Sequence, residues 1–164
     1  MRSSYMYNFL RDSYHKLLLR RADDSVKQFS MEGVQCYGVL VSVYDGDTFR
    51  AVIHANGHLK KMTFRPIGYD TPEMRPPKVM ENRERHIEKA KEARQKFIEL
   101  CGGMHSYVFL RCGKFDKYGR VLVHVSNRRY SRRTINDMML ESGLAQMYHG
   151  GKKAIFELSE EKSA

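Results

Sequence analysis

The sequence of 164 residues contains no tryptophan, four prolines and three cysteines. Cys36, Cys101 and Cys112 are odd in number and lack CxxC spacing, which argues against a disulfide framework or a zinc cage. We expect reduced, mostly buried thiols. Long apolar runs are also missing, and the three leucines at 17–19 are too short an apolar core for a secretory signal. We therefore expect an intracellular protein of the cytoplasm or nucleus.

Acidic side chains are scarce relative to basic ones. Lys and Arg total 29 against 19 Asp and Glu, so the formal net charge is +10. This balance suits a polyanionic partner, either nucleic acid or an acidic membrane surface, better than a neutral small molecule. A chain of this length has room for one well-buried core, so we expect one domain with irregular ends.

The first thirty residues predict an amphipathic helix, because apolar side chains recur there at helical spacing with cations around them. The apolar positions are Tyr7, Leu10, Tyr14, Leu17 and Leu18. We favour a helix that packs this stripe on the main body; the alternative is a helix that binds a membrane surface or mediates self-association. We divide the chain into a helical extension at 1–35, a central domain at 36–149 and a charged C-terminal tail at 150–164.

From residue 36 apolar and polar residues alternate, which predicts strands. The apolar positions expected to share one side are Val39, Val41 and Val43 in the first strand and Phe49, Ala51 and Ile53 in the second. Asn56-Gly57 is a strong hairpin signal between the second strand and a third at 59–65.

The second half of the chain predicts two helices and two more strands. Helical periodicity at 87–101 ends at a pair of glycines, and Thr134 with Asp137 forms a capping pair before a short helix. Strands are expected at 106–112 and 120–126. The order of elements predicts a mainly β fold with helices, namely a five-stranded oligonucleotide-binding (OB-fold) barrel with flanking helices.

Two short stretches concentrate acidic residues in this basic chain: VYDGDTFRA at 43–51 and FRPIGYDTPE at 64–73. Turn chemistry alone explains Asp45 and the glycine after it, but leaves Asp47 unexplained. In the second stretch, nearby prolines disfavour a helix, so its acids fall in a loop after an apolar strand. Such carboxylates raise each other's pKa unless a cation neutralises them.

A bound divalent metal would resolve this conflict. Oxygen ligands from Asp47, Asp70 and a loop carbonyl suit Ca²⁺, Mg²⁺ or Mn²⁺ rather than zinc, and leave positions for water and substrate. Arginine beside such a site pairs with phosphate oxygens, and the candidates are Arg65 and Arg120. Together these residues predict phosphodiester cleavage.

Four motifs resemble the staphylococcal nuclease (thermonuclease) family, in its order and approximate spacing. They are DGDTF at 45–49, FRPIGYDTPE at 64–73, DKYGR at 116–120 and INDMMLESGLA at 135–145. The resemblance covers roughly residues 36–149. It implies a five-stranded OB-fold barrel and a Ca²⁺-dependent endonuclease that hydrolyses DNA, RNA or both and leaves 3′-phosphate ends.

The resemblance also implies roles for individual residues. The metal ligands would be Asp47, Asp70 and the Thr71 carbonyl, with Asp45 supporting them. The catalytic residues would be Glu73, which positions the attacking water, and Arg65 and Arg120, which hold the phosphate. Nucleotide contacts would come from Lys117 and Tyr118. Where the family has a pair of tyrosines, this chain departs from it and offers Tyr148 for the same contact.

Two alternatives concern how the chain uses nucleic acid. Some members of the family have lost catalytic residues and only bind; because every implied catalytic position is filled here, we favour catalysis over a silent binding module. The run NRRYSRR at 127–133 is a solvated loop in most settings. On a barrel that binds nucleic acid it is also a candidate for phosphate contacts.

Overall fold

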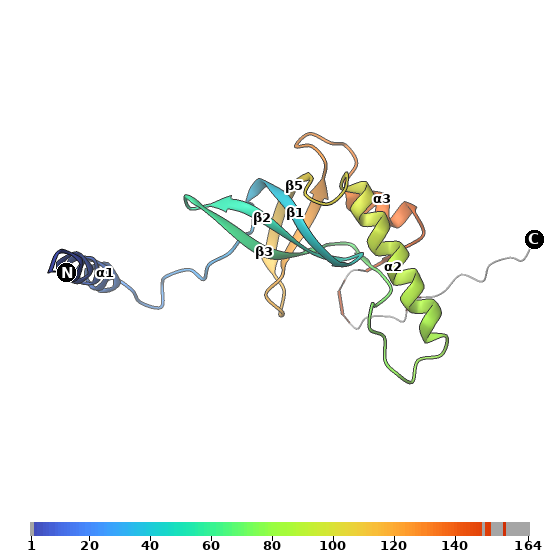
Figure 1. Cartoon of the computed structure of the whole chain (residues 1–164), viewed down its shortest axis with the longest axis horizontal. Helices are drawn as coiled ribbons and strands as arrows, with labels where there is room; N and C mark the ends of the chain where they lie inside the picture. The colour runs from blue at the N-terminus through green and yellow to red at the C-terminus, as the bar shows by residue number, and fades with distance from the viewer. Residues whose placement is uncertain (1, 149, 152–155, 157–164) are drawn as a thin grey trace, which may run out of the picture. The chain divides into compact units, whose positions relative to one another are not determined.

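The computed structural model forms two compact units, residues 1–30 and 31–164 (Figure 1). The residues that it describes are 2–148, 150–151 and 156, so most of the predicted C-terminal tail lies outside them. In the first unit, helix α1 spans Arg2–Leu19, and the side chain of Tyr7 is outside the described part. None of the described helices is both long and apolar enough to cross a membrane. That α1 packs on the main body stays a prediction.

The second unit is built on a closed barrel of five strands, as predicted. Its strands are β1 (Gln35–Asp45), β2 (Thr48–Ala55), β3 (His58–Pro66), β5 (Tyr107–Phe115) and β6 (Val121–Ser126). They neighbour one another in the order β1, β2, β3, β6, β5, and β5 pairs with β1 to close the barrel. The pair β3 and β6 is parallel, and the other pairs are antiparallel.

The predicted alternation is confirmed in β2 and partly wrong in β1. Phe49, Ala51 and Ile53 are all buried in the core. In β1, however, Leu40 and Val43 are buried while Val39 and Val41 are only half-buried. The register is irregular between Leu40 and Ser42. After this bulge, the side chains that point into the core are shifted by one residue, so a strict alternation does not predict them.

The predicted hairpin turn is confirmed between β2 and β3. Asn56 and Gly57 both have positive φ, at 52° and 76°, and the flanking residues Ala55 and His58 are paired. These are the dihedrals that a two-residue turn needs to match the twist of its strands, and Asn-Gly adopts them at low cost.

Helices α2 (Arg83–Leu100) and α3 (Ile135–Glu141) lie beside the barrel (Figure 1). Phe97 of α2 enters the core, with its ring centroid 5.2 Å from that of Phe49. The predicted capping box is present at the start of α3, where the Thr134 hydroxyl accepts from the Asp137 N–H and the Asp137 carboxylate accepts from the Thr134 N–H.

A short antiparallel pair outside the barrel, β4 (Tyr69–Asp70) with β7 (Gln146–Met147), was not predicted. Asn136 of α3 supports the same region. Its side-chain oxygen accepts from the Val125 N–H at 2.9 Å, and its amide nitrogen donates to the Ile67 carbonyl at 2.9 Å. These bonds fix the start of the segment after β3, which carries Asp70, Thr71 and Glu73 of the predicted site.

Candidate active site

The site begins at the tight turn between β1 and β2. Asp45 ends β1 and Asp47 precedes β2, and both are buried, with exposed fractions of 6% and 2%. The Asp47 N–H donates to Asp45 Oδ1 at 3.1 Å, which is the bond that a turn aspartate commonly makes. The Asp45 carboxylate thus stabilises the turn, whereas the Asp47 carboxylate contacts Arg65 and Thr71.

Gly46 lets this turn approach the segment after β4. A Cβ at Gly46 would lie 2.7 Å from Thr71 Cγ2 and 3.0 Å from Ala93 Cβ, which is too close for a real side chain. The Gly46 carbonyl also accepts a 2.8 Å hydrogen bond from the buried Tyr69 hydroxyl. The approach brings Asp47 to Thr71, whose N–H donates to Asp47 Oδ2 at 3.1 Å.

Arg65, at the end of β3, joins the two carboxylates predicted to bind metal. Its Nη1 pairs with Asp47 Oδ1 at 2.7 Å, and its Nη2 pairs with Asp70 Oδ1. Burial opposes the charge of this guanidinium, but the two carboxylates outweigh burial and raise the pKa of Arg65. Because two negative charges face one positive charge, the group keeps an excess of negative charge.

The excess of negative charge extends to Asp45. Burial, and then the charge of Asp47, raise the pKa of Asp45 to about 7, and Glu73 adds to the effect. This carboxyl therefore holds a proton more readily than an ordinary aspartate does. A positive ion placed among these groups would lower that pKa, which is the behaviour expected of an acidic cluster built for a cation.

Arg120 reaches the same site from the loop between β5 and β6. Its Nε pairs with Asp116 Oδ2 at 2.7 Å, and its Nη1 donates to Thr48 Oγ1 at 3.0 Å. The Thr48 hydroxyl in turn donates to Asp47 Oδ1 at 3.1 Å. Burial would raise the pKa of Asp116, but hydrogen bonds from Arg120 and its loop outweigh burial and lower it. A continuous chain of hydrogen bonds thus links Arg120 to the acidic cluster.

Two tyrosines stand beside these arginines. The ring centroid of Tyr118, a side chain that is 71% exposed, lies 5.0 Å from Lys117 Nζ and 5.4 Å from Arg120 Cζ. The ring of Tyr148 lies 5.7 Å from Arg65 Cζ. Such contacts stabilise the cations and leave aromatic faces next to the predicted phosphate position.

These segments, far apart in the sequence, form one open pocket of about 690 Å³. Nine of the ten predicted site residues line it: Asp45, Asp47, Arg65, Asp70, Glu73, Lys117, Tyr118, Arg120 and Tyr148. Thr71 is buried and is not part of the wall, although its N–H contacts Asp47. The carboxyl group of Glu73 belongs to an exposed residue, so water can reach it.

The oxygen donors of the site fit a hard divalent cation, but they do not distinguish among Ca²⁺, Mg²⁺ and Mn²⁺. Among the residues that the structure describes, no three His, Cys, Asp or Glu side chains are placed to hold a metal ion by themselves. Asp47 and Asp70 offer carboxylate oxygens, and a backbone carbonyl would have to supply the next ligand. An all-oxygen set with excess negative charge suits Ca²⁺, Mg²⁺ or Mn²⁺.

Sequence reasoning missed several residues that support this site. Asp116 anchors Arg120, Thr48 connects Arg120 to Asp47, and Tyr69 holds the turn through Gly46. Asp116 also accepts from the Tyr118 and Arg120 N–H groups at 2.9 Å, a local pattern that an aspartate opening a turn predicts. The contact of Arg120 with Thr48 and that of Tyr69 with Gly46 join residues 72 and 23 positions apart, so no local pattern in the sequence predicts them.

Comparison with known proteins supports the motif-level resemblance. The family model described as staphylococcal nuclease homologue matches residues 63–163, more than half of the chain. A comparison with curated proteins gives no match. The matched range contains Arg65, Asp70, Glu73 and Arg120, and the turn with Asp45 and Asp47 precedes it.

Proposed function

The chain belongs to the staphylococcal nuclease homologue family, and on this premise we propose that it is a metal-dependent nuclease that hydrolyses phosphodiester bonds of DNA, RNA or both. The observation that carries the proposal is the single pocket that gathers the carboxylates and arginines of three separate motifs. The net charge of +10 suits a polyanionic substrate. We further propose Ca²⁺ as the preferred metal and 3′-phosphate ends as the product.

Arg120 is the proposed phosphate-binding residue for which the structure offers the most support. Arg120 lies on the pocket wall, and its side chain is held in place by Asp116 and Thr48. A donor fixed in advance loses little entropy when a phosphate arrives, and its charge is in place where the transition state gathers negative charge. Lys117 and Tyr118, next to it in the loop, would contact the neighbouring nucleotide.

Glu73 is the proposed residue for positioning water. It lies on the pocket wall with Arg65 and Arg120, and it is exposed, so a water molecule can reach its carboxylate. A carboxylate in this place can accept a proton from water and orient it for in-line attack on phosphorus.

Arg65 connects the two halves of the proposed site. Asp47, Asp70 and the Thr71 carbonyl would hold the metal, and Arg65 already pairs with both of these carboxylates. When bound, the cation would polarise the phosphoryl oxygen and offset its developing charge. We propose that Arg65 keeps the carboxylates in place and donates to the phosphate from the same position.

A paired substitution tests the role of Glu73. Glu73→Gln removes a carboxylate from the pocket, and Glu81→Gln removes an exposed one outside it. Cleavage of a single-stranded oligonucleotide should fall by about 10²-fold or more in the first variant and stay unchanged in the second. Binding measured in chelator should stay the same in both variants.

The alternative, a module that binds nucleic acid without cutting it, makes a different prediction in the same assay. The wild type would then bind the oligonucleotide and leave it intact in Ca²⁺, Mg²⁺ and Mn²⁺. That result would replace the enzyme with the binding module. Analysis of the ends of any product tests separately whether the phosphate stays on the 3′ side.

A further inference from the structure

An aromatic and basic surface lies on the outer wall of the barrel, away from the pocket. Val108 and Leu110 of β5 belong to the main core cluster, whereas Tyr107 is exposed and Phe109, although buried, lies outside that cluster and packs on Tyr37 and Arg129. Phe109 is paired with Tyr37 of β1. We call the group of Tyr37, Tyr107, Phe109, Arg129 and Tyr130 the outer aromatic surface.

Four of the five members contact one another, and Tyr107 lies two positions before Phe109 in β5. The rings of Tyr37 and Phe109 meet edge to face, with centroids 5.1 Å apart. Arg129, from the loop after β6, places its Cζ 6.0 Å from the centroid of Phe109 and 5.7 Å from that of Tyr130. Phe109 is thereby covered and only 2% exposed, whereas Tyr130 is 87% exposed and Tyr107 71% exposed. The buried ring of Phe109 thus lies beneath Arg129, which also contacts the open ring of Tyr130, while Tyr37 is 50% exposed.

The charge around this surface is positive. The loop at 127–133 contains four arginines and no acidic residue. Arg133 pairs with Glu141, and Arg129 lies over the aromatic rings. Arg111 occupies the next outward position of β5 after Phe109, so the positive charge continues along the strand.

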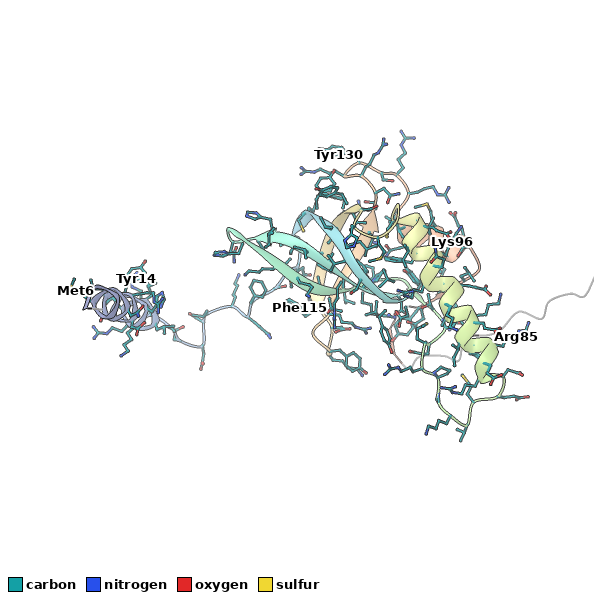
Figure 2. The ribbon with its side chains drawn as sticks, in the orientation of Figure 1. Met6, Tyr14, Arg85, Lys96, Phe115 and Tyr130 are labelled. Atoms are coloured by element: carbon teal, nitrogen blue, oxygen red, sulfur yellow. The ribbon has the colours of Figure 1, made fainter. Side chains whose placement is uncertain are left out.

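This surface is separate from the pocket. The strand β5 runs from Tyr107 to Phe115 and leads into the loop that carries Arg120. Eight steps along a strand span about 26 Å. Figure 2 shows Tyr130 and Phe115 at opposite ends of the barrel, in agreement with this path. None of the five members lines the pocket.

We propose that the outer aromatic surface is a second binding site for single-stranded nucleic acid, used by substrates long enough to leave the pocket. Bases would stack on Tyr130 and Tyr107, and arginines of the loop would contact phosphates. Stacking of bases on aromatic rings next to a positively charged surface is the usual mode of single-strand binding. The absence of acidic residues from the loop favours a polyanion over a protein partner. The proposal rests on the proposed function for the nature of its ligand.

Binding as a function of oligonucleotide length tests the proposal. The full chain is titrated, in chelator, into labelled single strands of roughly 4 and roughly 20 nucleotides, lengths chosen to fill one site or to span both. Tyr130→Ala should weaken binding of the longer strand by about 5-fold or more and leave the shorter one unchanged. Tyr130→Phe should keep the affinity, because it keeps the ring.

Arg129→Gln should also weaken binding of the longer strand selectively. Its matched control is Lys91→Gln, which removes one exposed positive charge from α2. Equal affinity losses in these two variants would mean that only net charge matters and would overturn the site. So would a loss in Tyr130→Ala that is the same at both lengths, or no loss at all.

The outcomes separate this proposal from the proposed function. Binding without cleavage in any metal, with the length-dependent loss in Tyr130→Ala, would keep the second site and reject the nuclease. Cleavage without any effect of Tyr130→Ala on binding would keep the nuclease and reject the second site. A wild type that binds neither strand would reject both.

Discussion

The guanidinium of Arg65 pairs with the carboxylate of Asp47 at 2.7 Å, although the two residues are separated by 18 positions, with Asp47 in the turn before β2 and Arg65 in β3. Both side chains are buried, with exposed fractions of 10% and 3%. A charge in such a place is tolerated only while its partner is present. Folding of the barrel and assembly of the acidic cluster are therefore linked through this pair.

Replacing Arg65 should destabilise the fold. Arg65→Gln leaves Asp47 and Asp70 buried without their cation, so the free energy of unfolding should fall by about 3 to 5 kcal/mol. Denaturant titration in chelator measures this. Arg120→Ala is the control, because its pair with Asp116 is partly exposed and should cost about 1 kcal/mol or less. Equal losses in the two variants would refute the assigned difference.

Filling the space above Gly46 should disturb both stability and the site. In Gly46→Ala the new Cβ meets Thr71 at 2.7 Å, so the turn must move, at a cost of about 1 to 3 kcal/mol. In the control Gly113→Ala, the nearest atom is 3.4 Å away, and little change is expected. Thermal unfolding compares the two variants. An unchanged melting temperature in Gly46→Ala would show that the turn is not packed as described.

The anchor of Arg120 should matter for rate more than for stability. Asp116→Asn weakens the 2.7 Å pair that fixes the guanidinium, and we expect kcat/KM to fall by about tenfold or more. In an Arg120→Ala background the same substitution should cost little further rate, because the side chain that it positions is gone. Additive losses in this double-mutant cycle would mean that Asp116 acts independently of Arg120.

The capping box of α3 should add acid-sensitive stability. Hydrogen bonds from the Thr134 hydroxyl and N–H lower the pKa of Asp137 below its ordinary value of 3.8. A group whose pKa is lower in the folded state stabilises the fold above the unfolded pKa and loses this effect as pH falls through the folded pKa. Asp137→Asn should therefore be less stable than the wild type at pH 7, with a difference that shrinks below about pH 4. The control is Glu88→Gln, an exposed change for which no such difference is expected.

Local signals in the sequence predicted a large part of the fold. The Asn56-Gly57 turn, the Thr134 and Asp137 capping box and the inward side of β2 each depend on residues within a few positions of one another. The order of these elements then restricted the fold to a small barrel. The bulge in β1 and the β4 with β7 pairing were missed because they are set by distant partners.

In the candidate site, too, local motifs predicted some features, and contacts between distant residues set the others. Motif order indicated which residues gather in the pocket, including Asp47, Asp70 and Arg120. The sequence did not indicate that Arg65 pairs with both predicted metal carboxylates, or that Thr48 links Arg120 to Asp47. Such contacts depend on how three strands and two loops meet, which no short motif encodes.

The most direct test of the central claim is the initial rate at which the purified full chain cuts single-stranded DNA and RNA in Ca²⁺, compared with the rate in chelator. We predict metal-dependent cleavage that returns when Ca²⁺ is added back, because the pocket combines hard oxygen donors with a fixed arginine at the same place. Intact substrate in Ca²⁺, Mg²⁺ and Mn²⁺, from protein that still binds it, would contradict the claim.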